Sequence, residues 1–100
     1  MVRHEIEWLL DESDDEGLQT SYRRAIRDLG FVVTLDGTLA KYPGSTHLHI
    51  TKPGKSGTLE LTIWPSKKSV WYSIQSRRHG EWIEQGINGI EFSRRSKPLK

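Results

Sequence analysis

Residues 46–84 read THLHITKPGKSGTLELTIWPSKKSVWYSIQSRRHGEWIE, and this stretch decides the fold. Apolar and polar residues alternate along four runs, and segments rich in glycine, proline, serine and basic residues separate the runs. Alternation at period two is typical of strands, and the separating segments are typical of turns. The stretch therefore predicts a meander of four antiparallel strands with one apolar face. Its apolar residues are Leu48, Ile50, Leu59, Leu61, Ile63, Val70, Tyr72, Ile74 and Ile83.

The apolar residues also predict how the strands pair, because a slip of one residue would turn a whole strand over. The register that keeps them opposite one another pairs Ile50 with Leu59, Leu48 with Leu61, Ile63 with Val70, Leu61 with Tyr72, and Ile74 with Ile83. On the other face, the same register predicts three rows of touching side chains. These rows are His49, Glu60, Ser73 and Glu84; His47, Thr62 and Trp71; and Thr51, Thr58, Gln75 and Trp82.

An amphipathic helix over about residues 14–29 is expected to cover the apolar face of this sheet. Ser13-Asp14-Asp15-Glu16 matches a capping box, in which a serine hydroxyl and a glutamate carboxylate satisfy amides at the helix start. Gly30 suits the left-handed residue that ends a helix. The apolar stripe of this helix is formed by Leu18, Tyr22, Ala25, Ile26 and Leu29.

The segments around this helix are less distinctive. Val2 to Leu10 fits a strand or a short helix, and we favour the helix. Phe31 to Leu35 has strand composition, with Phe31, Val33 and Leu35 expected to point inward, and the segment after Glu84 fits a short strand or a turn of helix. The fold class is therefore predicted to be α+β: an antiparallel meander sheet of four or five strands with one helix packed on one face.

Length and composition limit the broad class of the protein. The 100 residues predict a single domain, 1–100, and 34% hydrophobic with 28% charged residues is typical of a globular chain. The absence of cysteine excludes disulfides and thiolate metal sites and is consistent with the cytoplasmic location that we expect. The apolar run Trp8-Leu9-Leu10 is too short for a signal peptide or a membrane span, so we expect no membrane partner.

Charge is distributed unevenly along the chain. Residues 1–20 hold seven acids and one base, whereas residues 21–100 hold six acids and fourteen bases. We therefore distinguish an acidic N-terminal segment, 1–12, and a basic tail, 93–100, which we expect to be frayed. An acidic head on a basic body indicates either a polyanionic partner or a head that folds back onto the body.

The first group of candidate functional residues is His47, His49, Glu60 and Glu84. Two histidines at alternate positions of a strand point the same way, and a neighbouring carboxylate would complete a metal site or an acid–base pair. The same residues would also be explained by a cross-strand hydrogen bond between His49 and Glu60. The sequence alone assigns no metal and no cofactor to them.

The second group is basic and aromatic. The predicted meander brings its first and third loops to the same end, which gathers Lys52, Lys55, Arg77 and Arg78 into a patch that could neutralise phosphates. Trp71 and Trp82 are predicted on the polar face, where indoles could stack on bases. They could equally seal a homodimer or be covered by the N-terminal segment.

One stretch resembles a known family. A helix that ends in Leu29-Gly30-Phe31, then strands, then Gly44-Ser45-Thr46-His47, resembles the start of the HicA-type toxin ribonucleases. The resemblance covers residues 22–64 and implies an α-β-β-β-α fold and a catalytic role for His47. The chain departs from the family pattern at Thr46, which separates serine from histidine.

Three functions follow from these observations. The first is a small, non-catalytic binding module for RNA or DNA, in which Lys52, Lys55, Arg77 and Arg78 bind phosphates. The second is a protein-interaction or homodimeric module that uses the tryptophan-bearing sheet face. The third is a small nuclease or hydrolase that uses His47, His49 and Glu60.

Overall fold

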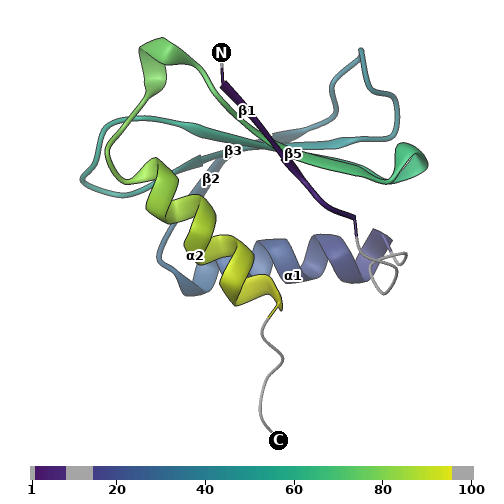
Figure 1. The fold of residues 1–100 in the computed structure, drawn as a ribbon, viewed down its shortest axis with the longest axis horizontal. Coiled ribbons are helices and arrows are strands. Elements are labelled where there is room, and N and C mark those ends of the chain that lie inside the picture. The colour runs from purple at the N-terminus through teal and green to yellow at the C-terminus, as the bar shows by residue number, and fades with distance from the viewer. Residues whose placement is uncertain (1, 9–14, 96–100) are drawn as a thin grey trace, which may run out of the picture.

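The computed structural model describes residues 2–8 and 15–95. In this part of the chain, five antiparallel strands form one sheet in the order β1-β5-β4-β3-β2, and both α-helices lie on the same side of it (Figure 1). None of the helices described is long and apolar enough to cross a membrane. The elements are β1 (Val2–Ile6), α1 (Asp15–Asp28), β2 (Val32–Gly37), β3 (Thr46–Thr51), β4 (Leu59–Trp64), β5 (Ser69–Ile74) and α2 (Ile83–Arg95).

The α+β class and the register of the central strands are confirmed. The observed pairs include Leu48 with Leu61, Ile50 with Leu59, Ile63 with Val70, and Leu61 with Tyr72. These side chains are buried under α1 and α2, so the side of the sheet that faces the helices is the core face. We call the opposite side of the sheet the reverse face.

The predicted fourth strand of the meander is wrong, because Ile83 begins α2. Ile83, Ile87 and Ile90 are buried and recur at spacings of four and three residues, which is the apolar stripe of a helix. Ile74, the predicted partner of Ile83, pairs with Val2 instead. The sheet is therefore covered by two helices, where the sequence predicted one.

Two glycines explain why α2 was not recognised. Glycine disfavours helix by about 1 kcal/mol relative to alanine, which weakens the local signal. A Cβ added at Gly86 would lie 3.0 Å from the Trp82 ring, and one added at Gly89 would lie 3.5 Å from Leu29. Gly86 thus lets α2 pack closely on Trp82, whereas a side chain at Gly89 would make only ordinary contact with Leu29. Residues 93–95 of the predicted frayed tail belong to α2, and residues 96–100 lie outside the described part.

The N-terminal segment forms a strand where a helix was predicted. β1 pairs with β5, with Val2 opposite Ile74 and Ile6 opposite Val70. Pairing gives the edge of β5 a partner for its backbone groups, a gain that a helix could not supply. The predicted capping box lies largely outside the described residues, and α1 begins at Asp15.

The end of α1 forms as predicted. Gly30 has a φ of +80°, which glycine adopts at little cost. The amide of Gly30 donates to the carbonyl of Arg27, and the amide of Phe31 donates to that of Ile26, both over 3.0 Å. This pair of bonds is a Schellman motif, which directs the chain from the helix into β2.

A bulge in β2 changes the face on which its side chains lie. Val33 is opposite Ile50 on the core face, but the register then shifts and Leu35 is opposite His49. The extra residue, Thr34, reverses the alternation, so Leu35 points to the reverse face. The prediction that Leu35 points inward is therefore wrong.

A polar network ties the two helices to the sheet. The Glu91 carboxylate on α2 accepts hydrogen bonds from the hydroxyls of Tyr22 and Tyr72, each over 2.8 Å. Its other oxygen accepts from Arg94 Nε over 3.0 Å. Burial, the neighbouring Tyr22 and the Glu91 charge together raise the pKa of Tyr72 well above the ordinary value of 10.0.

Tyr72→Phe is expected to make stability less sensitive to alkaline pH. The folded protein holds the Tyr72 proton more tightly than the unfolded chain does. The stability that Tyr72 contributes for this reason is complete below about pH 10 and is lost as the pH rises through the raised pKa. Urea titrations would measure the free energy of unfolding at each pH. Above about pH 10, it should fall faster in the wild type than in the variant, by up to about 1.4 kcal/mol per pH unit. Equal losses in both proteins would contradict this assignment.

Candidate metal centre

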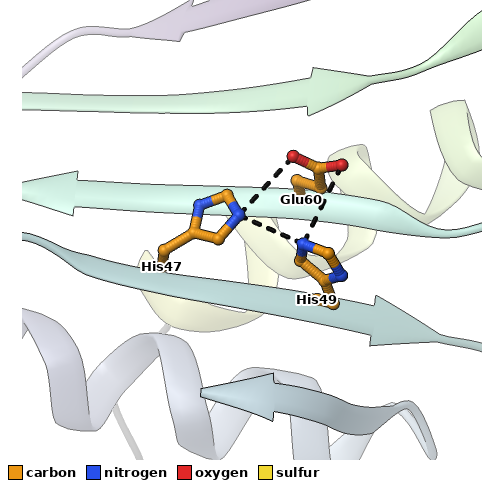
Figure 2. Close-up of side chains that lie close together, drawn as sticks. All are labelled: His47, His49 and Glu60. Atoms are coloured by element: carbon orange, nitrogen blue, oxygen red, sulfur yellow. Dashed lines mark hydrogen bonds and ion pairs between the residues drawn. The ribbon is translucent and has the colours of Figure 1, made fainter. Parts of the chain in front are cut away.

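Three side chains converge on one point of the reverse face (Figure 2). His47 and His49 occupy alternate positions of β3, so both project from the same face, and Glu60 of β4 lies opposite His49. The Nε2 atoms of the two histidines are 3.1 Å apart. His47 Nε2 lies 3.5 Å from Glu60 Oε1, and His49 Nε2 lies 3.9 Å from Glu60 Oε2. We call these three residues the His–Glu cluster.

The cluster is largely hidden from solvent. The side chains of His47 and Glu60 are each 8% exposed, and that of His49 is 19% exposed. A buried carboxylate is unfavourable by several kcal/mol unless a cation balances its charge. Burial lowers the pKa of His47, an effect that Glu60 opposes and His49 reinforces. The neutral form of His47 is therefore favoured, and a bound cation would balance the charge of Glu60.

Neighbouring side chains hold the cluster in position. In the tautomer that carries its hydrogen on Nδ1, His47 donates to Thr62 Oγ1 over 2.9 Å. Its Nε2 lone pair can then accept from His49 Nε2, 3.1 Å away, or bind a metal ion in place of that hydrogen bond. Gln75 Nε2 donates to Glu60 Oε2 over 3.0 Å, which orients the carboxylate. Such outer contacts fix the tautomer and the orientation of metal ligands.

The spacing of the donor atoms suits a metal ion. A tetrahedral ion with bonds of about 2.0–2.1 Å separates its ligand atoms by roughly 3.3–3.4 Å. The two Nε2 atoms, 3.1 Å apart, lie close to that separation, and each lies 3.5 or 3.9 Å from a different oxygen of Glu60. With one atom from each residue, the three donors lie within 4.8 Å of one another. The cluster can therefore provide three ligands of a metal site and leave a fourth position open.

A pocket of about 280 Å³ adjoins both imidazoles. Its other walls come from the end of β2 and from the chain that follows it, namely Leu35, Gly37, Thr38 and Leu39. The sequence did not predict this pocket, because Leu35 would face the core if β2 had no bulge. The pocket gives the cluster an access route from solvent.

The reverse face around Trp71 is covered by other parts of the chain. Tyr42 packs edge-on against Trp64 and Trp71, with ring centroids 4.9 and 5.0 Å apart. The guanidinium of Arg3 lies 4.0 Å above the Trp71 ring. Trp71 is consequently only 4% exposed. It offers no free ring face to a base or to a second protomer, whereas the neighbouring Trp64 is half-buried.

Two further predicted positions are wrong. Trp82 lies in the core, where its ring centroid is 5.2 Å from that of Phe31, and it is 6% exposed. Glu84 lies on the exposed surface of α2, so it does not extend the row of Glu60. Ser73 of that row lies opposite Glu60 as predicted, and its neighbour on the other side is Arg3 of β1. Both errors have one cause, because the chain after Gly80 leads into α2 and not into a fourth strand of the meander.

The two basic loops do meet, as predicted. The amide of Thr58 donates to the carbonyl of Arg78 over 2.8 Å, and the Trp82 indole donates to the carbonyl of Ser56 over 2.8 Å. A Cβ at Gly80 would lie 2.1 Å from the Ser56 oxygen, so only glycine permits this approach. A pocket of about 480 Å³ lies there, and its lining includes Lys52, Lys55, His79 and Glu81.

Thr62→Val is expected to weaken zinc binding by about 10- to 100-fold, the usual effect of removing an outer contact to a metal ligand. Valine preserves the shape of the side chain but removes the oxygen that holds Nδ1 of His47. Competition with a fluorescent zinc chelator would measure the change. Thr34→Val is the control, since the Thr34 hydroxyl donates to a backbone carbonyl, that of His49, over 3.5 Å. Equal affinities in the two variants would count against an orienting role for Thr62.

Comparison with models of known families, with characterised proteins and with solved structures finds no match to this chain, so the resemblance to the HicA-type ribonucleases gains no support from it.

Proposed function

We propose that the protein binds a divalent transition-metal ion, zinc by ligand preference, through His47, His49 and Glu60 and uses it in hydrolysis. The observation that carries the proposal is the donor geometry of the His–Glu cluster, three ligand atoms within 4.8 Å of one another. Two imidazoles and one carboxylate with an open fourth position are a ligand set of hydrolytic zinc enzymes. Bound zinc supplies a water of lowered pKa at that position.

The chain's own residues would provide the surroundings of such a centre. Thr62 and Gln75 orient two of the ligands, and burial keeps His47 in the neutral form that binds metal. Two imidazoles and one carboxylate suit zinc, which binds nitrogen ligands more tightly than iron(II) or manganese(II) does.

A metal titration tests the proposal. Protein stripped with a chelator should bind one equivalent of Zn²⁺ in calorimetry at neutral pH. At a free zinc concentration of about 100 times Kd, the free energy of unfolding should rise by about 2.7 kcal/mol. Co²⁺ should bind in its place and give the intense visible absorption of a tetrahedral site. If wild-type protein takes up neither metal, the proposal fails.

Nucleic-acid binding is a second candidate, favoured by the meeting of the two basic loops. Four bases, Lys52, Lys55, Arg77 and Arg78, lie on loops that Gly80 allows into backbone contact. Four phosphate contacts predict that log Kobs for single-stranded RNA falls against log salt with a slope of about −2.8.

Fluorescence anisotropy with a labelled single-stranded RNA would test this second candidate. The double variant Lys52→Gln/Lys55→Gln should reduce the slope by about half. The control is Lys67→Gln/Lys68→Gln, which removes the same charge from the β4–β5 connection at the other end of the strands. An RNA affinity that does not change with salt concentration would eliminate the basic loops as the interface. An equal loss of affinity in the two double variants would do the same.

A further inference from the structure

The pocket beside the His–Glu cluster has aliphatic walls, which would not be required if the bulge in β2 served the fold alone. The register shift between Val33 and Leu35 takes one leucine out of the core and places it, 45% exposed, beside His49. Leu39 from the following chain forms a second apolar wall of the same pocket. Bulges often re-aim side chains next to functional sites. Here the result is two aliphatic side chains beside two metal-binding imidazoles.

Charge and size limit what this pocket can hold. A divalent ion held by one carboxylate and two neutral imidazoles retains one net positive charge, which favours a monoanionic ligand. The pocket volume of about 280 Å³ corresponds to roughly nine water molecules at about 30 Å³ each. A ligand of fewer than about ten non-hydrogen atoms would fill this volume.

From these features we infer that the pocket takes a short aliphatic acyl group, with an anionic oxygen at the open metal position and the alkyl chain against Leu35 and Leu39. This inference depends on the proposed metal centre and adds its substrate class, esters or amides of short aliphatic acids. Hydrolysis of such an ester consumes one water, breaks the acyl carbon–oxygen bond, and releases an alcohol and a carboxylic acid, which ionises to the carboxylate.

Aliphatic hydroxamates of increasing chain length test the inference, because they bind zinc as anions and carry the same alkyl groups. Calorimetry of the zinc-loaded full chain should show affinity rising about fourfold for each added methylene until the pocket is full. Leu35→Asn should flatten this dependence and leave zinc affinity unchanged. Val32→Asn is the control, since Val32 is 46% exposed on the same strand but does not line the pocket.

The outcomes separate the inference from the proposed function. Zinc binding with no dependence on chain length, or equal effects of Leu35→Asn and Val32→Asn, overturns the inference and leaves the metal centre standing. Tighter binding of dimethyl phosphate than of a four-carbon hydroxamate also overturns it, because the substrate would then be a phosphodiester. Failure to bind zinc overturns both.

Discussion

His49→Ala is expected to lower zinc affinity more than about 100-fold, beyond the range seen for outer contacts to metal ligands. The substitution removes one of three ligands and leaves two donors, His47 and Glu60. His49 has the most exposed side chain of the three ligands, 19% against 8% for the other two, so its loss should disturb packing least. Calorimetric zinc titration and far-ultraviolet circular dichroism would measure the two effects.

Two other variants sharpen this test. Glu60→Gln keeps the size of the side chain but removes its charge, so zinc affinity should again fall by more than about 100-fold. His79→Ala removes an exposed histidine of the basic loops and should leave zinc affinity as it is in the wild type. If His49→Ala binds zinc as tightly as His79→Ala does, the His–Glu cluster is not the metal site.

Glu91→Ala is expected to lower the free energy of unfolding by about 3–5 kcal/mol, the usual effect of removing one partner of a buried ion pair. The loss is large because the carboxylate accepts bonds from Tyr22, Tyr72 and Arg94 at once. The Arg94 side chain is only 2% exposed and would be left without this carboxylate. Since small domains have about 5–15 kcal/mol of stability in total, the variant should be close to unfolding.

Urea titration followed by tryptophan fluorescence would measure this loss. Glu84→Ala is the matched control, because it removes a carboxylate from the exposed side of the same helix and should change stability by less than about 0.5 kcal/mol. Glu91→Gln should fall between the two, since an amide oxygen can still accept the tyrosine hydrogen bonds. A Glu91→Ala protein as stable as Glu84→Ala would show that the network does not hold the helices to the sheet.

The His–Glu cluster could be found from the sequence because side chains alternate between the two faces of a regular strand such as β3 or β4. Once Leu48 was placed opposite Leu61, parity alone put His49 beside Glu60, and both predictions are confirmed. The meeting of the basic loops followed from the same pairing. Alternation at period two thus predicts the pairing of strands wherever apolar partners are present on both strands.

Alternation did not predict the structure of segments where such partners are missing. Ile83 was a single apolar residue, which cannot distinguish a strand from the first turn of a helix. Thr34 inserts one residue into β2, and the resulting change of face at Leu35 leaves no mark in the local alternation. The partner of β1 lies far away in the sequence, so no nearby pattern could have assigned it. The pocket, which depends on the bulge, was therefore out of reach.

The pairing of β1 with β5 has a consequence for how the chain acquires its structure. Among the described strands, β1 and β5 are the farthest apart in the sequence, yet they pair, with Val2 opposite Ile74. Contacts between such distant residues form slowly, because a long loop must close before they bring any gain. Until β1 has joined it, β5 has an open edge that could pair with a strand of another chain.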